Sequence, residues 1–231
     1  MKIRYFHPAF IDSAQSLMNE FKDDTSNTLL ILGFNAAMFF GYEYDDIVKG
    51  YDRVIIFNQE NLVHCRDHYW FDKFMAHIGR ADEVWDYTES NMAFLAGHGI
   101  EAKLHILKPY MNWDAYAPVE KDIDFLLYGS LSPRRMRVVE FLREKYNVVT
   151  VTGNDDKPDT SLMSGVYGSV LDDYILRSRV LLNIHASDDQ QEQEHARMVK
   201  WIGAPCQIIS ERSIHNYLNV PEMDYWELFA L

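Results

Sequence analysis

Short hydrophobic runs rich in β-branched residues alternate along the chain with segments whose apolar positions recur at helical spacing. In the first half the runs cover residues 3–6, 28–32, 53–57, 83–87 and 103–107. In the second half they cover 125–128, 148–151, 180–184 and 207–209, and helices are predicted over 133–145, 171–178 and 190–202. Because strands alternate with helices through short connections, the pattern predicts an α/β fold with parallel sheets.

The alternation is interrupted once, over residues 109–121, where two prolines and a polar Glu-Lys-Asp run offer no strand. We interpret this segment as an interdomain linker. A chain of 231 residues is long enough to bury two cores. The pattern therefore predicts two small Rossmann-like domains, residues 1–115 and 122–231, whose parallel sheets face one another across a cleft that binds ligands.

Charge and composition restrict the partners. The net charge of −13 opposes bulk binding to nucleic acid, although a few arginines gathered in one pocket can still hold a small anion. Cys65 and Cys206 lie far apart without metal-type spacing, so we expect reduced packing thiols. No apolar run reaches the roughly 18 residues of a membrane span, and no apolar leader follows Met1, so a cytoplasmic location is expected.

The segment 124–135 has the features of an anion site. A buried strand leads into a small-residue turn at 129–131, and Ser132 and Pro133 are suited to begin a helix, which points free backbone N–H groups at the turn. Arg134 and Arg135 oppose the helix dipole in that first turn, which favours an anionic ligand such as phosphate. The alternative is that both arginines pair with acids on the surface.

These motifs, taken in chain order, resemble a glycosyltransferase of the two-Rossmann-domain (GT-B) type, glycosyltransferase family 1/4-like. The resemblance covers roughly residues 54–212 and is carried by 82–91, 98–100, 124–135, 182–185, 194–197, 203–205 and 210–211. It implies that the C-terminal domain holds a nucleotide-diphosphate sugar, that the N-terminal domain offers the acceptor, and that no bound metal is required. Two departures matter: Gln190 and Met198 stand where many retaining members carry glutamates, and the chain is short for this architecture.

The resemblance and the chemistry of the departing phosphate together suggest a donor site. Negative charge on that phosphate calls for cations and N–H donors, and the matching positions are Gly129, Ser130, Arg134 and Arg135. Candidate hydroxyl-binding groups are Glu194 and Glu211, and Arg197 is expected to hold Glu194 in place. Glu194 and Arg197, three residues apart, would share a helix face, so an ordinary surface ion pair is the alternative.

One histidine is predicted at the edge of the donor site. His185 follows the strand 180–184 and should emerge at its carboxyl end, where an imidazole can bond a phosphate or a sugar hydroxyl and act in catalysis. The alternative is a structural histidine that supports a domain interface.

Acceptor-side candidates follow strands of the first domain. Asn35, Gln59 and His64 are expected at the cleft edge, and Glu60 or His64 is a candidate general base toward an acceptor hydroxyl. A retaining enzyme would need no such base, so the stereochemical outcome stays open. The aromatic triplet at 69–71 is interpreted as core or interface rather than a sugar platform.

Metal-like patterns are discounted. The Asp122-Ile123-Asp124 sequence precedes a strand rather than following one, and residues 64–68 lack a second ligand pair for zinc. The prediction is therefore a metal-independent glycosyltransferase that moves a sugar from a nucleotide-diphosphate sugar, its only co-substrate, to a hydroxyl acceptor: a saccharide, a small molecule or a modified base in DNA. The alternative is a non-catalytic nucleotide-sugar or nucleotide binding module.

Overall fold

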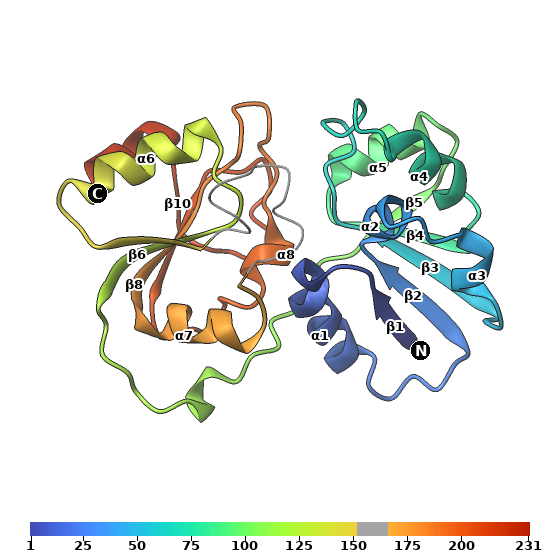
Figure 1. Cartoon of the computed structure of the whole chain (residues 1–231), viewed down its shortest axis with the longest axis horizontal. Coiled ribbons are helices and arrows are strands. Elements are labelled where there is room, and N and C mark those ends of the chain that lie inside the picture. The colour runs from blue at the N-terminus through green and yellow to red at the C-terminus, as the bar shows by residue number, and fades with distance from the viewer. Residues whose placement is uncertain (152–165) are drawn as a thin grey trace. The chain divides into compact units, whose positions relative to one another are not determined.

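The computed structural model describes residues 1–151 and 166–231, and the chain divides into two compact units, Met1–Lys108 and Pro109–Leu231 (Figure 1). Each unit is built on one five-stranded parallel sheet. The predicted α/β class, with two Rossmann-like units on parallel sheets, is confirmed. All nine predicted strands form, and one short strand is added near the C-terminus.

The first unit alternates strands and helices from its first residues. Its elements are β1 (Lys2–Tyr5), η1 (Pro8–Phe10), α1 (Ile11–Glu20), β2 (Thr28–Leu32), α2 (Phe34–Phe39), α3 (Tyr44–Val48), β3 (Arg53–Asn58), α4 (Phe71–Ile78), β4 (Glu83–Asp86), α5 (Glu89–Ala96) and β5 (Ala102–Leu104). β5 is shorter than predicted, because residues after it turn back to α1, where the Ser16 hydroxyl donates to the Lys108 carbonyl at 2.7 Å. The strand order is β1-β2-β3-β4-β5, so it never reverses.

Side chains of the central strands in this unit are buried on both faces. Alternate residues such as Leu29, Ile31 and Ile56 pack with α2, α3, α4 and α5 in one core cluster. Their neighbours, among them Leu30 and Phe57, are fully buried and point to the opposite face because side chains alternate along a strand. Burial on both faces explains why these strands appear in the sequence as continuous apolar runs.

The second unit alternates strands and helices in the same way. Its elements are η2 (Trp113–Ala115), β6 (Ile123–Tyr128), α6 (Pro133–Arg143), β7 (Val148–Val151), α7 (Ser169–Arg177), β8 (Ser178–Asn183), α8 (His195–Met198), β9 (Gln207–Glu211), β10 (Glu222–Met223) and η4 (Tyr225–Ala230). The strand order is β10-β9-β8-β6-β7. The order therefore reverses between β6 and β8, which creates a crevice at their carboxyl ends, the usual ligand position in open α/β sheets.

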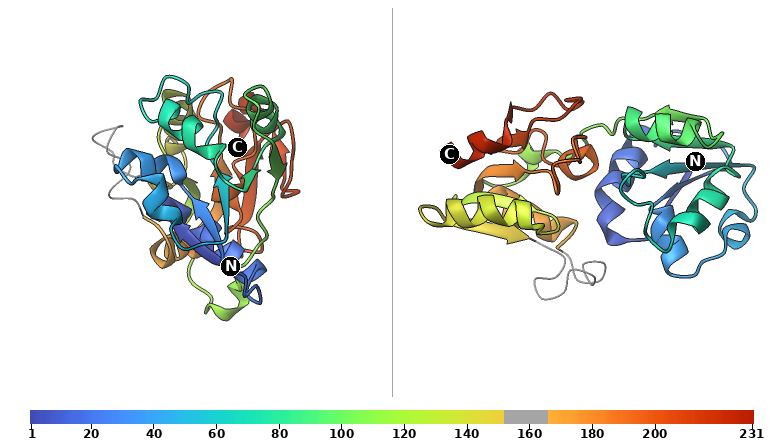
Figure 2. Two further views of the ribbon diagram at one scale, coloured as in Figure 1. Left: turned by 90° about the vertical axis from the view of Figure 1, so that its right-hand side faces the viewer. Right: turned by 90° about the horizontal axis from the view of Figure 1, so that it is seen from above.

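Two separate cores cover the two faces of this second sheet. Leu126 and Leu181 pack with α7, whereas Phe125, Leu127 and Leu182 pack with α6 and η4. Figures 1 and 2 show α6 and α7 on opposite sides of the sheet. Because side chains alternate between the two faces along β6, successive residues of this strand pack against α7 and α6 in turn.

Segment 109–121, predicted as a linker, packs on the second unit. Trp113 is buried and its indole N–H donates to the Lys200 carbonyl at 3.0 Å, while the Tyr116 hydroxyl donates to Asp172 at 2.8 Å. Lys200 is itself buried and paired with Asp172 at 2.6 Å. These contacts attach the segment to α7 and to the chain that follows α8.

The helix predicted over 190–202 is reduced to α8. Before it, the Gln193 side chain donates to Asn216 at 2.8 Å and accepts from the Leu218 N–H at 2.9 Å, and the Ile214 N–H donates to the Gln191 carbonyl. These tertiary hydrogen bonds hold residues 190–194 in an irregular conformation and override their helical spacing.

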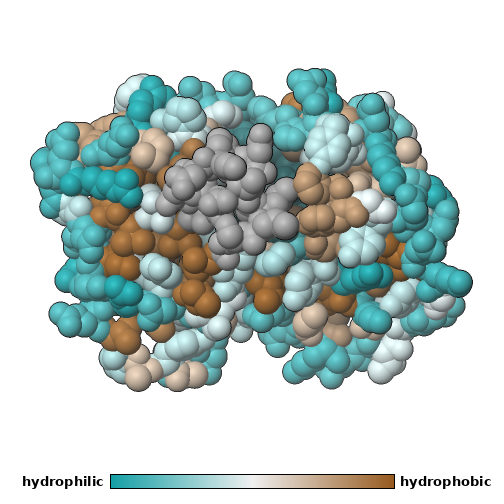
Figure 3. Space-filling model, in the orientation of Figure 1, coloured by the Kyte–Doolittle hydropathy of each residue, from teal (hydrophilic) through white to brown (hydrophobic). Residues whose placement is uncertain are grey.

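Hydrophilic side chains cover most of the rim of both units on the face drawn in Figure 3, and hydrophobic ones emerge in patches. Within the described residues, no helix is both long enough and apolar enough to cross a bilayer.

Candidate functional site

The turn after β6 lies at the reversal point of the second sheet and begins α6. The Ser132 side chain accepts from the Arg135 N–H at 3.3 Å, and Pro133 is the first helical residue, which confirms the predicted cap. Gly129 has φ +131°, a backbone conformation that side-chain-bearing residues rarely adopt. A Cβ at this position would lie 2.9 Å from Cζ of Arg197, so glycine also permits the close approach of that guanidinium.

Arg135 bridges the crevice between the two strands. Its Nη1 donates to the Ser130 carbonyl at 2.8 Å, at the end of β6, and its Nε donates to the Ile184 carbonyl at 2.7 Å, just beyond β8. Only 1% of the residue is exposed. Burial, together with the neighbouring charge of Arg197, lowers the pKa of Arg135 to about 10, so the guanidinium stays charged at neutral pH.

Glu194 and Arg197 complete this cluster. The Glu194 carboxylate lies 3.1 Å from Nη2 of Arg135 and 2.5 Å from Nη1 of Arg197, and Arg197 also reaches Oδ1 of Asn183 at 3.3 Å. Burial opposes ionisation of Glu194, but the charges of Arg197, Arg135 and His185 outweigh it and lower the pKa of the carboxyl. Two guanidinium groups around one carboxylate leave a net positive charge, which suits a further anion.

Arg134 turns the other way and is saturated by acids. It makes a bidentate pair with Glu211, with both N···O distances 2.6 Å, and its Nε donates to Asp188 at 2.6 Å. Its guanidinium lies 3.6 Å from the centre of the Tyr225 ring. Arg134 therefore pairs with acids, as the alternative expected, but it does so as a buried residue rather than on the surface, and its bidentate partner is the predicted hydroxyl-binding residue Glu211.

His185 lies beside Arg134 and Glu211. Its backbone N–H donates to Glu211 at 2.9 Å, and its Nε2 lies 3.2 Å from the Arg212 carbonyl. Because a carbonyl only accepts, Nε2 carries a proton. Nδ1 is buried and meets no hydrogen-bond partner among residues 1–151 and 166–231. The imidazole thus braces the chain beyond β9 and keeps one ring nitrogen without a partner in this part of the chain.

A cavity of about 430 Å³ opens beside these contacts at the carboxyl ends of β8, β9 and β10. It is lined by Arg134, Asp188, Gln191, Glu211, Arg212, Ser213, Ile214 and Asp224. All the predicted donor-side residues therefore lie at one edge of the second sheet. Gly129, Ser130, Arg135, Glu194 and Arg197 form one contact group, and Arg134, Glu211 and His185 form its neighbour.

The predicted acceptor-side residues lie at the carboxyl edge of the first sheet. Asn35, in the first turn of α2, donates from Nδ2 to Oε1 of Glu60 at 3.0 Å. Gln59 precedes Glu60 after β3, and both polar atoms of its side chain are buried and meet no partner within the described part of the chain. His64 lies in the turn that follows and is exposed.

Asp86 lies at the same edge, and no role was predicted for it from the sequence. It ends β4, is fully buried, and accepts from Nδ2 of Asn58 at 2.8 Å, from Nδ2 of Asn91 at 3.0 Å and from the Thr88 N–H at 3.0 Å. Burial raises the pKa of its carboxyl to about 7. The only sequence signal is an acid at the end of an apolar strand, because its amide partners lie 28 and 5 residues away.

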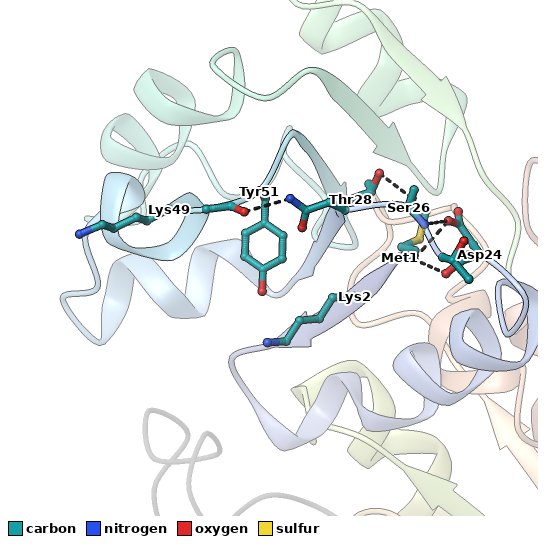
Figure 4. A pocket seen from close by; sticks show the side chains of 10 residues that line it. Met1, Lys2, Asp24, Ser26, Thr28, Lys49 and Tyr51 are labelled. Atoms are coloured by element: carbon teal, nitrogen blue, oxygen red, sulfur yellow. Dashed lines mark hydrogen bonds and ion pairs between the residues drawn. The ribbon is translucent and has the colours of Figure 1, made fainter.

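A second cavity, of about 560 Å³, lies at the opposite, amino edge of the first sheet (Figure 4). Its lining includes Lys2, Lys49 and Tyr51, and Nζ of Lys2 lies 5.9 Å from the Tyr51 ring centre. None of the predicted site residues lines it, and ligands of open α/β sheets bind at the other edge.

No family model matches the chain. Three uncharacterized proteins of Acanthamoeba polyphaga mimivirus are similar: "Uncharacterized protein L138" is 32% identical over 103 residues (45% of this chain, 10% of that protein), and "Uncharacterized protein L140" is 25% identical over 205 residues (87% and 54%). "Uncharacterized protein L137" is 25% identical over 223 residues (91% and 28%). The chain spans about half or less of these relatives.

Two solved structures show a distant likeness. One is a "Glycosylation Associate Protein (Gap123) complex from Streptococcus agalactiae", with a TM-score of 0.37 and 10% identity over 95% of this chain and 51% of that one. The other is a "UDP-N-acetylglucosamine 2-epimerase", with a TM-score of 0.33 and 13% identity over 96% and 67%. Likenesses with TM-scores this low carry no argument about activity.

Proposed function

We propose that the chain is a glycosyltransferase that binds a nucleotide-diphosphate sugar at the reversal point of its second unit and transfers the sugar to a hydroxyl acceptor bound by its first unit. The observation that carries the proposal is the Arg135–Glu194–Arg197 cluster at the ends of β6 and β8. A diphosphate leaving group gains negative charge as the glycosidic bond breaks, and fixed cations in a partly buried site stabilise it.

The cluster is held in place before any ligand arrives. Arg135 is fixed by two backbone carbonyls and holds Glu194, while the partly exposed guanidinium of Arg197 rests against Gly129, so Arg197 need not reorganise strongly to meet a phosphate. The backbone N–H groups at the start of α6 add donors of the same kind. Glu194, kept ionised by its arginines, is suited to accept hydrogen bonds from ribose or sugar hydroxyls.

His185 and Glu60 are the proposed catalytic groups. Nδ1 of His185, which has no partner in the described part of the chain, would form a hydrogen bond with a hydroxyl or phosphate oxygen of the bound donor. Glu60, braced by Asn35, would accept the proton of the acceptor hydroxyl if the sugar inverts. No metal or cofactor enters this scheme, and the nucleotide-diphosphate sugar is the co-substrate.

The first test is binding. Purified full-length chain is screened by thermal shift against UDP, GDP, ADP and their sugar conjugates, with and without divalent cations, because a ligand of the native state raises the melting temperature. A selective shift by one diphosphate without metal is expected. A flat response to all of them would refute the donor site.

Variants then locate the site. Arg197→Ala removes a partly exposed guanidinium, and the loss of one charge-assisted bond, about 1.5–3 kcal/mol, weakens nucleotide binding roughly tenfold to a hundredfold. Arg137→Ala, an exposed arginine on the same helix α6, is the matched control and should bind as wild type does. Equal affinity of Arg197→Ala and wild type would place the nucleotide elsewhere.

A further inference from the structure

We infer that the first unit carries a saccharide-binding surface, formed by α2 and the loop between β3 and α4, and that the acceptor is therefore a saccharide. The surface is defined by Asn35, Phe39, Gln59, Glu60 and Tyr69. The acceptor role rests on the proposed function, whereas saccharide binding is a property of the first unit that is tested without any donor.

The polar end of this surface is built on a buried scaffold. Nδ2 of Asn58 and Nδ2 of Asn91 each donate to the Asp86 carboxylate and also to the Glu60 carbonyl, at 2.8 and 2.7 Å. The Glu60 N–H donates back to Oδ1 of Asn58 at 3.2 Å. Asp86 thus orients two amides that clamp the backbone of Glu60, and the chain there is fixed rather than a loose surface loop.

Gln59 supplies unused hydrogen-bonding capacity at the same place. Both its Oε1 and its Nε2 are buried, yet neither has a partner among the described residues, although its neighbours Asn58 and Glu60 are fully engaged with the scaffold. A buried amide without partners is costly in a native protein unless a water or a ligand completes it. An amide that donates and accepts side by side matches a pair of vicinal hydroxyls.

Aromatic rings lie one helical turn from this polar end. Asn35 and Phe39 are four residues apart on α2 and share a face, about 6 Å apart along the axis. The same helix and loop meet twice: through Asn35 and Glu60 at 3.0 Å, and through the rings of Phe39 and Tyr69, whose centres are 5.7 Å apart. Phe39 is 42% exposed and Tyr69 is 72% exposed, whereas Trp70 and Phe71, also in the aromatic triplet, are buried in the core.

A sugar ring is the ligand that uses both ends of such a surface. Its C–H face is apolar and packs against an exposed aromatic ring, and its rim of hydroxyls pairs with amides and carboxylates. The surface lies at the carboxyl edge of a parallel sheet, where open α/β sheets bind ligands, and its polar groups stand beside the exposed rings of Phe39 and Tyr69. The buried Gln59 amide favours a saccharide as the occupant, because vicinal hydroxyls would complete both of its polar atoms while the sugar's C–H face covers a ring.

The test is carried out on the full chain without nucleotide, by applying it to an array of immobilised oligosaccharides and titrating each bound oligosaccharide in solution. Binding of one structural class of saccharide is expected, with at least a tenfold loss in Tyr69→Ala and in Gln59→Ala. Trp226→Ala, which removes a 75% exposed aromatic ring from the second unit, is the control and should bind as wild type does.

Three results would overturn the inference: no saccharide bound by the wild type, equal binding by Tyr69→Ala, or concentration-dependent dimerisation that Tyr69→Ala abolishes, which would make the surface a self-interface. Nucleotide thermal shifts measured on the same samples keep the two proposals separate. A nucleotide shift without saccharide binding overturns this inference alone, whereas saccharide binding without a nucleotide shift leaves it standing and removes the glycosyltransferase.

Discussion

Replacing Asp86 by asparagine should abolish a pH dependence in the stability of the first unit. The carboxyl is fully buried among neutral amides and backbone N–H groups, and burial raises its pKa from 3.8 to about 7. The folded state therefore holds the proton more tightly than the unfolded chain. Its stabilising contribution is complete below pH 3.8 and is lost as the pH rises through about 7.

The magnitude follows from the two pKa values. Their difference, 7 − 3.8 = 3.2, corresponds to a maximal cost of about 4 kcal/mol for burying the ionised carboxylate. Between pH 5 and pH 8, ionisation of this group should lower the free energy of unfolding of the wild-type first unit by about 2–3 kcal/mol. Asp86→Asn removes that slope, at a pH-independent cost of about 1 kcal/mol because its NH₂ group opposes the NH₂ group of Asn58 or Asn91.

Hydrogen exchange of the slowest amides in β3 and β4 measures the opening free energy of this unit directly. From pH 5 to pH 8 the opening free energy of Asp86→Asn should rise by about 2–3 kcal/mol relative to that of the wild type. Asp114→Asn, at an exposed position of the second unit, should show a constant difference. A constant difference for Asp86→Asn as well would refute the buried-carboxylate reasoning.

Two further variants probe the second unit. Gly129→Ala places a side chain at φ +131°, with its Cβ 2.9 Å from Cζ of Arg197. We expect it to lower the free energy of unfolding in a urea titration by about 1–3 kcal/mol, to displace Arg197 and to weaken nucleotide binding measured by calorimetry. Unchanged affinity would show that Gly129 does not belong to the nucleotide site. Arg134→Lys keeps the charge but loses the bidentate pair with Glu211. It should lower the free energy of unfolding by about 1.5–3 kcal/mol relative to the control Arg137→Lys. Equal stability of the two variants would contradict this prediction.

The sequence predicted the fold class because the central strands, above all β2 and β3, are buried on both faces and read as continuous apolar runs between turn residues. It also placed the candidate site residues at strand ends, because the carboxyl ends of parallel strands share one edge. Ser132, Gly129 and Arg135 could be placed this way, since they occupy a single strand-turn-helix unit and interact over short sequence distances.

Interactions between distant segments could not be predicted. Arg134 and Arg135 look alike in sequence, but they pair with different acids that are distant in the chain. Arg134 pairs with Glu211, 77 residues away, whereas Arg135 points into the crevice and pairs with Glu194, 59 residues away. The clamp by Asp86 on Glu60 depends on two asparagines from β3 and α5. The shortening of the helix at 190–202 depends on hydrogen bonds from residues 214–218 in the same way.

The most direct test of the central proposal is turnover at the arginine cluster. Full-length chain is incubated with the nucleotide-diphosphate sugar that gives the largest thermal shift and with a mixture of oligosaccharides, and mass spectrometry follows the free diphosphate and the extended saccharide. The proposal predicts equal amounts of both products in wild type and in Arg137→Ala, and at least tenfold less of each in Arg197→Ala. Nucleotide binding without either product would contradict glycosyl transfer and leave a binding module, and undiminished turnover by Arg197→Ala would contradict the site.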